Sequence, residues 1–247
     1  MSYDVRSYRS SSQGGDLSSF QVAIKETDLL VRVDKQSFQD SLIKKVEDTA
    51  WQHRRELEKF ISENPEFAQS LTPYLVAPGA PRTALLMSQA ANQAGVGPMA
   101  AVAGVFAELI GKELLQYTQE AVVENGGDIF LKVSKTRKVS IFCGNDSPFT
   151  GRLALEIKPK DTPLGVCTSS GIIGPSYSMG RADAVVAISA SAPLADATAT
   201  ALANMVKEKS DVDEAVQRAR EISGIKGVLV VKDDRLGAWG KIKIVSP

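Results

Sequence analysis

The sequence predicts an α+β fold with mostly antiparallel sheets and packed helices. Residues 20–24 alternate apolar and polar side chains, and a short turn at 26–28 leads into a second apolar run at 29–33, which is typical of a hairpin. A long stretch ending at Glu63 carries apolar residues at helical spacing. In the second half of the chain, several short apolar runs bounded by turn sequences are typical of strands.

The N-terminal third is expected to contain an arm, the first hairpin and the long helix. Residues 1–18 are rich in Ser, Gly and charge, which predicts a loose arm or an edge strand. Its anchoring side chains would be Tyr3, Val5 and Tyr8. Asp34 or Ser37 can cap the helix that runs to Glu63, and Pro65 is expected to end it.

The middle of the chain predicts a loop followed by two helical stretches. Residues 72–83 hold three prolines and a glycine, which exclude regular helix. Thr83 or Ser88 then begins a helix. Residues 92–98, with two glycines and a proline, lead into a small-residue helix at 99–117 whose N-terminus could face an anion. Spacing alone favours the simpler alternative, a turn into a core helix.

The second half alternates predicted strands and helices. Two hairpins are expected, one pairing 129–133 with 139–142 and one pairing 227–231 with 241–245 around a turn at 233–237. The other expected elements are strands at 153–157, 165–171 and 184–188 and helices from about 193 and at 211–222.

Length and composition bound the class of protein. The 247 residues predict one α+β domain spanning 1–247, with a two-lobed organisation as a possibility. Lys and Arg (29) balance Asp and Glu (29), so no nucleic-acid or membrane partner is expected. Without a visible signal sequence or membrane span, a cytoplasmic location is predicted. Cys143 and Cys167 are expected to be reduced thiols, and His53 to lie on a solvated helix face.

The run Glu124-Asn125-Gly126-Gly127-Asp128 is the first candidate site. Two adjacent glycines allow positive φ and close approach of a ligand to the backbone, and Asp128 adds a hard carboxylate suited to Mg²⁺. The same run is also a good hairpin turn or helix cap, and this architectural reading is somewhat favoured by the run alone. Asp128 is the residue that such a turn does not require.

A second candidate segment is the alanine-rich stretch that contains Asp196 and Thr200. These residues, four positions apart, share one face of a helix. A buried carboxylate beside a buried hydroxyl needs a compensating partner, which a divalent cation would supply. The alternative is a core helix with Asp196 in its first turn and Thr200 bonded to its own backbone. Hydroxyl and amide donors for a phosphate could come from Thr168, Ser169, Ser170 and Gly171, with Gly174, Pro175 and Ser176 after them.

Together these motifs resemble the ApbE superfamily, whose typical members are FAD:protein FMN transferases. The resemblance covers roughly residues 85–205. Within the superfamily, the chain is similar to an uncharacterised ApbE-related branch that carries the run Gly-Val-Gly-Pro-Met-Ala-Ala-Val-Ala-Gly, here at 95–104. It implies an ApbE-like α+β fold, FAD or FMN in a cleft, and Mg²⁺ held by Asp196 and Thr200. Asp128 and the backbone of Gly126 and Gly127 would line the same cleft.

The chain departs from the transferases in one stretch. Between the Thr-Ser turn and the Asp-bearing helix they carry His-x-x-Asp-Pro-x-Thr-Gly, which residues 171–183 lack. The first hypothesis is therefore an Mg²⁺-dependent protein that binds a flavin or related nucleotide and transfers or cleaves at its phosphate, with an acceptor protein as a possible partner. The alternative is a binding module that kept the fold and lost the chemistry. A structural, homo-oligomer-forming protein is the third hypothesis.

Overall fold

The computed structural model describes residues 15–171 and 180–247. Its centre is an eight-stranded sheet in the order β1-β2-β3-β4-β7-β8-β9-β10, and each neighbouring pair is antiparallel. The strands are β1 (Leu17–Ile24), β2 (Thr27–Asp34), β3 (Ala121–Asn125), β4 (Asp128–Lys132), β7 (Leu164–Ser169), β8 (Ala184–Ser189), β9 (Ile225–Lys232) and β10 (Arg235–Gly240). The antiparallel sheet confirms the predicted fold class.

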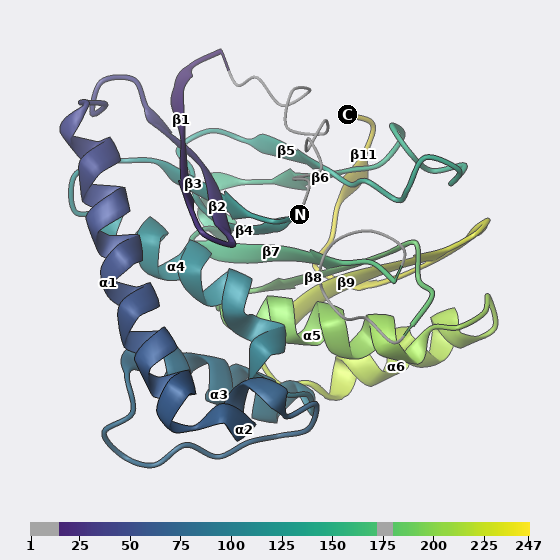
Figure 1. Ribbon diagram of the computed structural model, residues 1–247. Coiled ribbons are helices and arrows are strands. Elements are labelled where there is room, and N and C mark those ends of the chain that lie inside the picture. The colour runs from purple at the N-terminus through teal and green to yellow at the C-terminus, as the bar shows by residue number, and fades with distance from the viewer. Residues whose placement is uncertain (1–14, 172–179) are drawn as a thin grey trace.

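A three-stranded sheet, ordered β11-β6-β5, packs on one face of the large sheet (Figure 1). Its strands are β5 (Arg137–Ser140), β6 (Ala154–Ile157) and β11 (Ile244–Val245). The apolar side chains between the two sheets form a core of their own, which includes Leu131, Leu155 and Val166. A short 3₁₀ helix, η3 (Pro159–Asp161), leads from the small sheet back to β7.

Helices cover the other face of the large sheet (Figure 1). They are α1 (Ser41–Glu63), α2 (Pro65–Gln69), α3 (Arg82–Ala94), η2 (Pro98–Ala101), α4 (Val102–Leu114), α5 (Ala192–Met205) and α6 (Asp211–Glu221). The main core lies between these helices and the sheet, where Phe130, Ile110 and Leu202 are fully buried. Gly111 lets α4 lie directly on β4, since a Cβ there would come within 2.1 Å of the Phe130 ring.

The long helix begins later than its cap residues predicted. α1 starts at Ser41, after Asp40, so neither Asp34 nor Ser37 caps it. Asp34 instead joins distant segments, because its carboxylate accepts backbone N–H groups of Ser37 (2.9 Å), Gln119 (2.9 Å) and Glu120 (3.1 Å). A carboxylate that accepts hydrogen bonds from several backbone N–H groups holds the segments that donate them firmly together.

Two predicted hairpins were wrong, because one strand of each pairs with a different strand from the one expected. The segment Arg137–Ser140 is a strand, but it pairs with β6 in the small sheet instead of with β4. Likewise β9 pairs with Arg235–Gly240, while the chain beyond it joins the small sheet through β11. Strands of both sheets alternate apolar and polar side chains in the same way, so this alternation does not reveal which strand pairs with which. The pairing is set by long-range packing.

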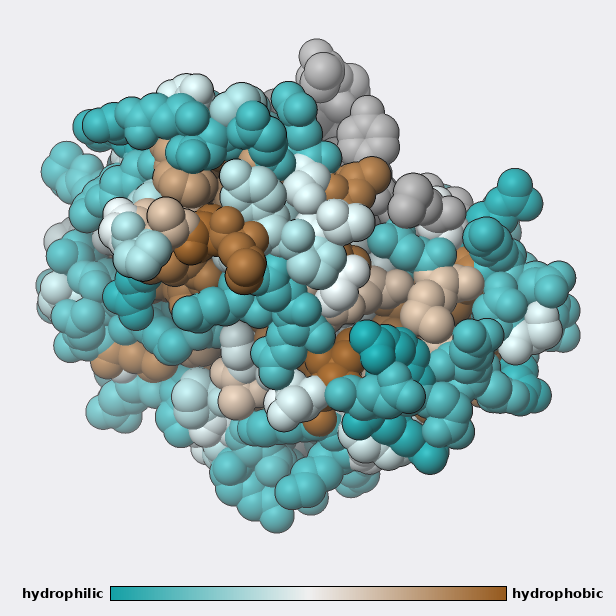
Figure 2. All heavy atoms as spheres, turned by 90° about the horizontal axis from the view of Figure 1, so that it is seen from below, coloured by the Kyte–Doolittle hydropathy of each residue, from teal (hydrophilic) through white to brown (hydrophobic). Residues whose placement is uncertain are grey.

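Other expectations concern the chain's ends and surface. Most of the predicted arm, with Tyr3, Val5 and Tyr8, lies outside the described residues, and β1 begins at Leu17. Among the described helices, none is by itself long and apolar enough to span a membrane; α3 and η2–α4 reach that length and composition only as a pair bent by 102°. On the face seen from below, apolar side chains surface in separate patches between hydrophilic ones (Figure 2).

Candidate functional site

The two glycines form the tight turn between β3 and β4. Asn125 pairs directly with Asp128, so Gly126 and Gly127 alone connect the strands, with φ of 69° and 103°. Positive φ at both central residues is the type I′ geometry that hairpins prefer. The hairpin interpretation is therefore right and the helix-cap alternative wrong. The segment before the turn is strand β3, which none of the predicted elements covered.

Strand alternation separates the side chains around this turn. Asn125 and Asp128 are paired and share the face that carries α4 and α5, whereas Glu124 and Ile129 share the opposite face. Asn125 uses its side-chain amide to donate to the Ala103 carbonyl at the start of α4 (3.3 Å). The turn is thereby attached to the helix layer.

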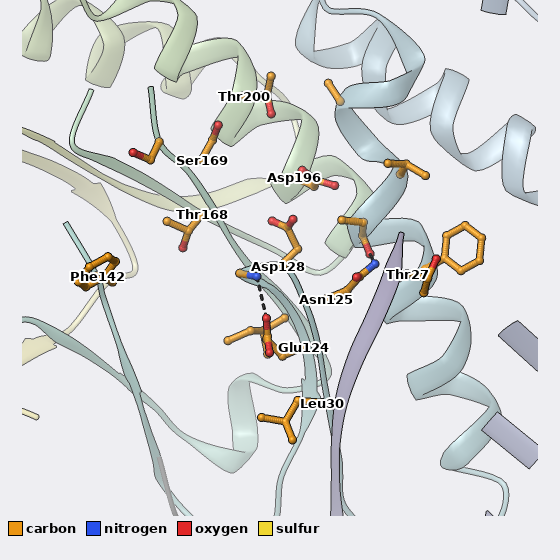
Figure 3. Close-up of a pocket in the computed structure, with 18 of the residues that line it drawn as sticks. Thr27, Leu30, Glu124, Asn125, Asp128, Phe142, Thr168, Ser169, Asp196 and Thr200 are labelled. Carbon is orange, nitrogen blue, oxygen red and sulfur yellow. Dashed lines mark hydrogen bonds between the residues drawn. The ribbon is translucent and has the colours of Figure 1, made fainter. Parts of the chain in front are cut away.

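Helix α5 carries Asp196 and Thr200 across from the turn. Figure 3 shows the Asp196 carboxylate close to that of Asp128, with Thr200 one turn further along α5. Asp196 is buried and Thr200 half-buried, and both line the same cavity as Asp128. The structure thus brings together two segments that are far apart in the sequence.

The first turn of α4 holds Asp196 in place. The Gly104 N–H donates to Asp196 Oδ2 over 2.8 Å. A Cβ at Gly104 would come within 2.5 Å of the Ala192 carbonyl oxygen and 2.8 Å of Asp196 Cβ, so only glycine lets the helices approach this closely. For this helix, spacing alone favoured a turn into a core helix over an anion site; in the structure its first turn contacts the side chain of Asp196.

The two carboxylates are electrostatically strained. Burial raises the pKa of Asp196 to about 7, although the N–H groups of Gly104 and Ala103 favour its charged form. Burial, followed by the negative charge of Asp196, holds the pKa of Asp128 well above its ordinary value. Asp128 Oδ1 is buried without a hydrogen-bond partner in the described structure. No described Lys or Arg forms an ion pair with either group.

The cavity beside these carboxylates measures about 1710 Å³. Its polar corner is formed by the glycine turn, Asp128, Asp196 and Thr200, and by a group of hydroxyl residues at the end of β7. That group is Thr168, Ser169 and Ser170. Away from this corner the wall is largely apolar, with Leu30, Phe106 and Phe142 among its residues.

One of the predicted donors, Gly171, falls outside this lining. Gly171 is not part of the wall; its N–H donates to the Ala182 carbonyl (2.9 Å), and a Cβ there would come within 2.2 Å of the Gly180 oxygen. Gly171 is thus a point of close backbone packing. The predicted donors at 174–176, and most of the interval in which the transferase histidine stretch is missing, lie outside the described residues.

Sequence reasoning assigned no role in the site to three residues around it. Glu108, buried on α4, accepts the Ala192 N–H at the start of α5 (2.7 Å) and so anchors the helix that carries Asp196. The buried Cys167 thiol lies next to Asp128, and burial raises its pKa well above the ordinary value. Glu124 accepts the Gly127 N–H (2.8 Å), as the dashed line in Figure 3 shows. Of these three residues, only Glu108 could have been noticed in the sequence, because it is a lone acid within an apolar helical run.

The remaining candidates lie elsewhere. Cys143 is free and buried in the core between the sheets, as Cys167 is in the helix-side core. His53 lies on α1 outside the cavity lining, and burial lowers its pKa. Among the described residues, no group of three or more His, Cys, Asp and Glu side chains could hold a metal ion. Any cation at the polar corner must therefore rely on two carboxylates, hydroxyl oxygens and a ligand.

Comparison with known proteins identifies the family. A family model described as "AbpE bacteria" matches residues 9–233. The chain belongs to this ApbE-related family. A UPF0280 protein from Methanopyrus kandleri is 40% identical over 235 residues, covering 92% of this chain and 93% of its own length. A UPF0280 protein from Methanocaldococcus jannaschii is 39% identical over 226 residues, with 90% of each chain covered.

Solved ApbE structures share the fold at low sequence identity. The apo flavinyl transferase ApbE of Pseudomonas stutzeri superposes with a TM-score of 0.56 at 14% identity, covering 91% of this chain and 95% of its own. The flavin transferase ApbE of Vibrio cholerae gives 0.53 at 17% identity, covering 90% and 96%. At such identities the likeness shows the ApbE fold alone, and it confirms the family resemblance seen in the sequence.

Proposed function

We propose that the cavity binds a flavin or related nucleotide through Mg²⁺ held between Asp128 and Asp196, with FMN-transferase-like chemistry at the phosphate. The observation that carries the proposal is the pair of buried, mutually repelling carboxylates on a cavity wall. Charges of one sign are buried together only at a cost, unless a counter-ion binds there. The orphaned Oδ1 atom of Asp128 is the free oxygen that such an ion requires.

The donor set fits Mg²⁺ better than the metals that prefer sulfur or nitrogen. Asp128, Asp196 and Thr200 offer only oxygen atoms, and Mg²⁺ is commonly bound by one or two carboxylates together with waters and substrate phosphates. When bound, the ion would neutralise charge on a pyrophosphate. The protein's share is to hold both carboxylates rigidly, through the N–H of Gly104 and the β3–β4 turn.

The size and lining of the cavity support a dinucleotide-sized ligand. Its volume of about 1710 Å³ exceeds the range of roughly 300–1,000 Å³ common for small-molecule pockets. The apolar wall with Leu30, Phe106 and Phe142 suits an aromatic ring system, and the polar corner suits phosphates. The titles of the structural relatives, flavin transferases, support a flavin as the first ligand to test.

Binding of FAD measured by flavin fluorescence, with Mg²⁺ and with EDTA, tests the proposal. We expect Mg²⁺-dependent binding that Asp128→Asn weakens at least about tenfold, because it removes one of two charged ligands. Asp213→Asn, an exposed change on α6 outside the cavity, is the matched control and should bind as the parent does. Absence of FAD binding under both conditions would contradict the proposal.

Product analysis separates the enzyme from a module that only binds. Release of FMN or AMP from FAD, or transfer of FMN to a protein, supports transferase-like chemistry, and its loss in Asp196→Ala would assign that chemistry to this corner. Tight binding of FAD that stays intact supports the non-catalytic alternative, which the missing histidine stretch at 171–183 favours.

A further inference from the structure

The amide group at the glycine turn is already occupied. Gly127 has a φ of 103°, and its N–H donates to Glu124 Oε1 over 2.8 Å (Figure 3). A backbone N–H exposed at a glycine turn is a common contact for a phosphate or carboxylate oxygen. Here the protein places its own carboxylate oxygen at that position.

Glu124 reaches this amide from the opposite face of the sheet. It is paired with Ile129, so its side chain begins on the face away from Asp128, yet it bends back to the turn and is only 5% exposed. Its negative charge also contributes to raising the pKa of Asp128. The corner therefore carries three neighbouring acids, from β3, β4 and α5, all lining one cavity.

The second amide at this corner is occupied in the same way. Gly104 N–H donates to Asp196 Oδ2, as Gly127 N–H donates to Glu124. Two backbone donors at this corner thus already contact carboxylates. An anion that enters without a cation meets the Glu124 carboxylate in place of the Gly127 N–H, whereas a cation-bound phosphate would be held through its cation at Asp128 and Asp196.

We propose that Glu124 is a specificity-determining residue that closes the glycine turn to anions and so restricts the cavity to phosphate ligands accompanied by a divalent cation. This inference rests on the proposed function, because it names which form of the nucleotide the site accepts. Glu124 acts by occupying the Gly127 N–H and by its charge. It is not assigned as a ligand of the cation, which is left to Asp128, Asp196 and Thr200.

Two substitutions separate the charge from the hydrogen bond. Glu124→Gln keeps an oxygen that can accept the Gly127 N–H but removes the charge, and Glu124→Ala removes both. Dissociation constants for FAD would be measured with Mg²⁺ and with EDTA for the parent and each variant. Glu221→Gln, an exposed change at the end of α6 and outside the cavity, alters the net charge equally and serves as the control.

The expected result is a gain of Mg²⁺-independent binding. In EDTA, Glu124→Gln should bind FAD about tenfold more tightly than the parent, and Glu124→Ala at least as tightly, since a nearby repulsive charge is worth about this much in a partly screened site. With Mg²⁺, the parent and both variants should agree within a few-fold. Glu221→Gln should match the parent in both conditions, and circular dichroism should show that all variants are folded.

Other outcomes overturn the inference in distinguishable ways. If the parent binds FAD with Mg²⁺ and Glu124→Gln gains nothing in EDTA, the inference fails while the proposed function stands. Weaker binding by both Glu124 variants with Mg²⁺ would make Glu124 a ligand contact and also refute it. If the parent binds FAD in neither condition, the proposed function fails and the inference with it. A parent that binds equally with and without Mg²⁺ refutes the selectivity directly.

Discussion

Asp196→Asn should make the metal-free protein more stable at pH 8 while abolishing its stabilisation by Mg²⁺. Burial raises the pKa of Asp196 to about 7, from an ordinary value of 3.8. An acid whose pKa is raised on folding stabilises the protein when protonated, and this stability is lost as the pH rises from about 4 to about 7. At pH 8 the folded parent therefore holds a costly buried charge that asparagine would lack.

The size of the effect follows from that pKa. The difference between about 7 and 3.8 corresponds to roughly 4 kcal/mol in the free energy of unfolding. Asparagine can still accept the Gly104 N–H, but a neutral acceptor is weaker than a carboxylate by about 1 kcal/mol. The expected net gain is thus about 3 kcal/mol at pH 8, or a rise in Tm of roughly 6–12 °C for a chain of this size.

Urea unfolding of both proteins in EDTA at several pH values between 5 and 8.5 measures this gain. The parent should lose stability as the pH rises through this window, and the variant much less. With Mg²⁺ at a hundred times its dissociation constant, the parent should regain about 2.7 kcal/mol and the variant nothing. A variant less stable than the parent in EDTA at pH 8, or equal Mg²⁺ stabilisation of both, would refute this reasoning.

Two further predictions concern the supports of the site. Gly104→Ala should reduce the free energy of unfolding by about 2–4 kcal/mol and weaken FAD binding, because its Cβ would meet the Ala192 carbonyl oxygen at 2.5 Å; unchanged urea midpoints and affinity would contradict this. Asp34→Ala should cost about 2–3 kcal/mol, since it leaves three backbone N–H groups without their acceptor. Burial raises the pKa of Asp34, but the Ser37 side chain and those N–H groups outweigh it and lower the pKa below the ordinary value. Its contribution is therefore present above about pH 4 and lost in acid; an equal difference between parent and variant at pH 7 and pH 2.5 would contradict it.

Local patterns predicted the elements well where side chains alternate over a long enough run. The β1–β2 hairpin, α5 and α6 follow directly from their apolar spacing and turn residues. β3 was missed because its five residues, Ala121–Asn125, follow a helix with no glycine or proline to mark the change. The partners of β5 and β11 were missed because a strand of the small sheet has the same pattern as a strand of the large one.

In the candidate site, some residues could be predicted from the sequence, whereas others depend on the folded geometry. Asp128 and Asp196 could be proposed because neither a turn nor an alanine-rich core helix explains a carboxylate at those positions. The role of Glu124 could not be predicted although the residue belongs to the first candidate run, because that role depends on a bend of the side chain back to the Gly127 N–H. Gly171 was overestimated for the opposite reason, since a glycine in a hydroxyl-rich turn looks like a ligand contact even where it serves backbone packing.

The first turn of α4 explains how two distant motifs form one corner. The Ala103 carbonyl accepts the side chain of Asn125 from the glycine turn, and the Gly104 N–H donates to Asp196 from α5. A helix start with free N–H groups is the part of the backbone that can hold a carboxylate without a basic side chain. Since no lysine or arginine in the described part of the chain pairs with Asp196, its carboxylate remains available to a cation. The small residues in the first turn of α4 are therefore as much a part of the proposed site as the two acids that they allow to meet.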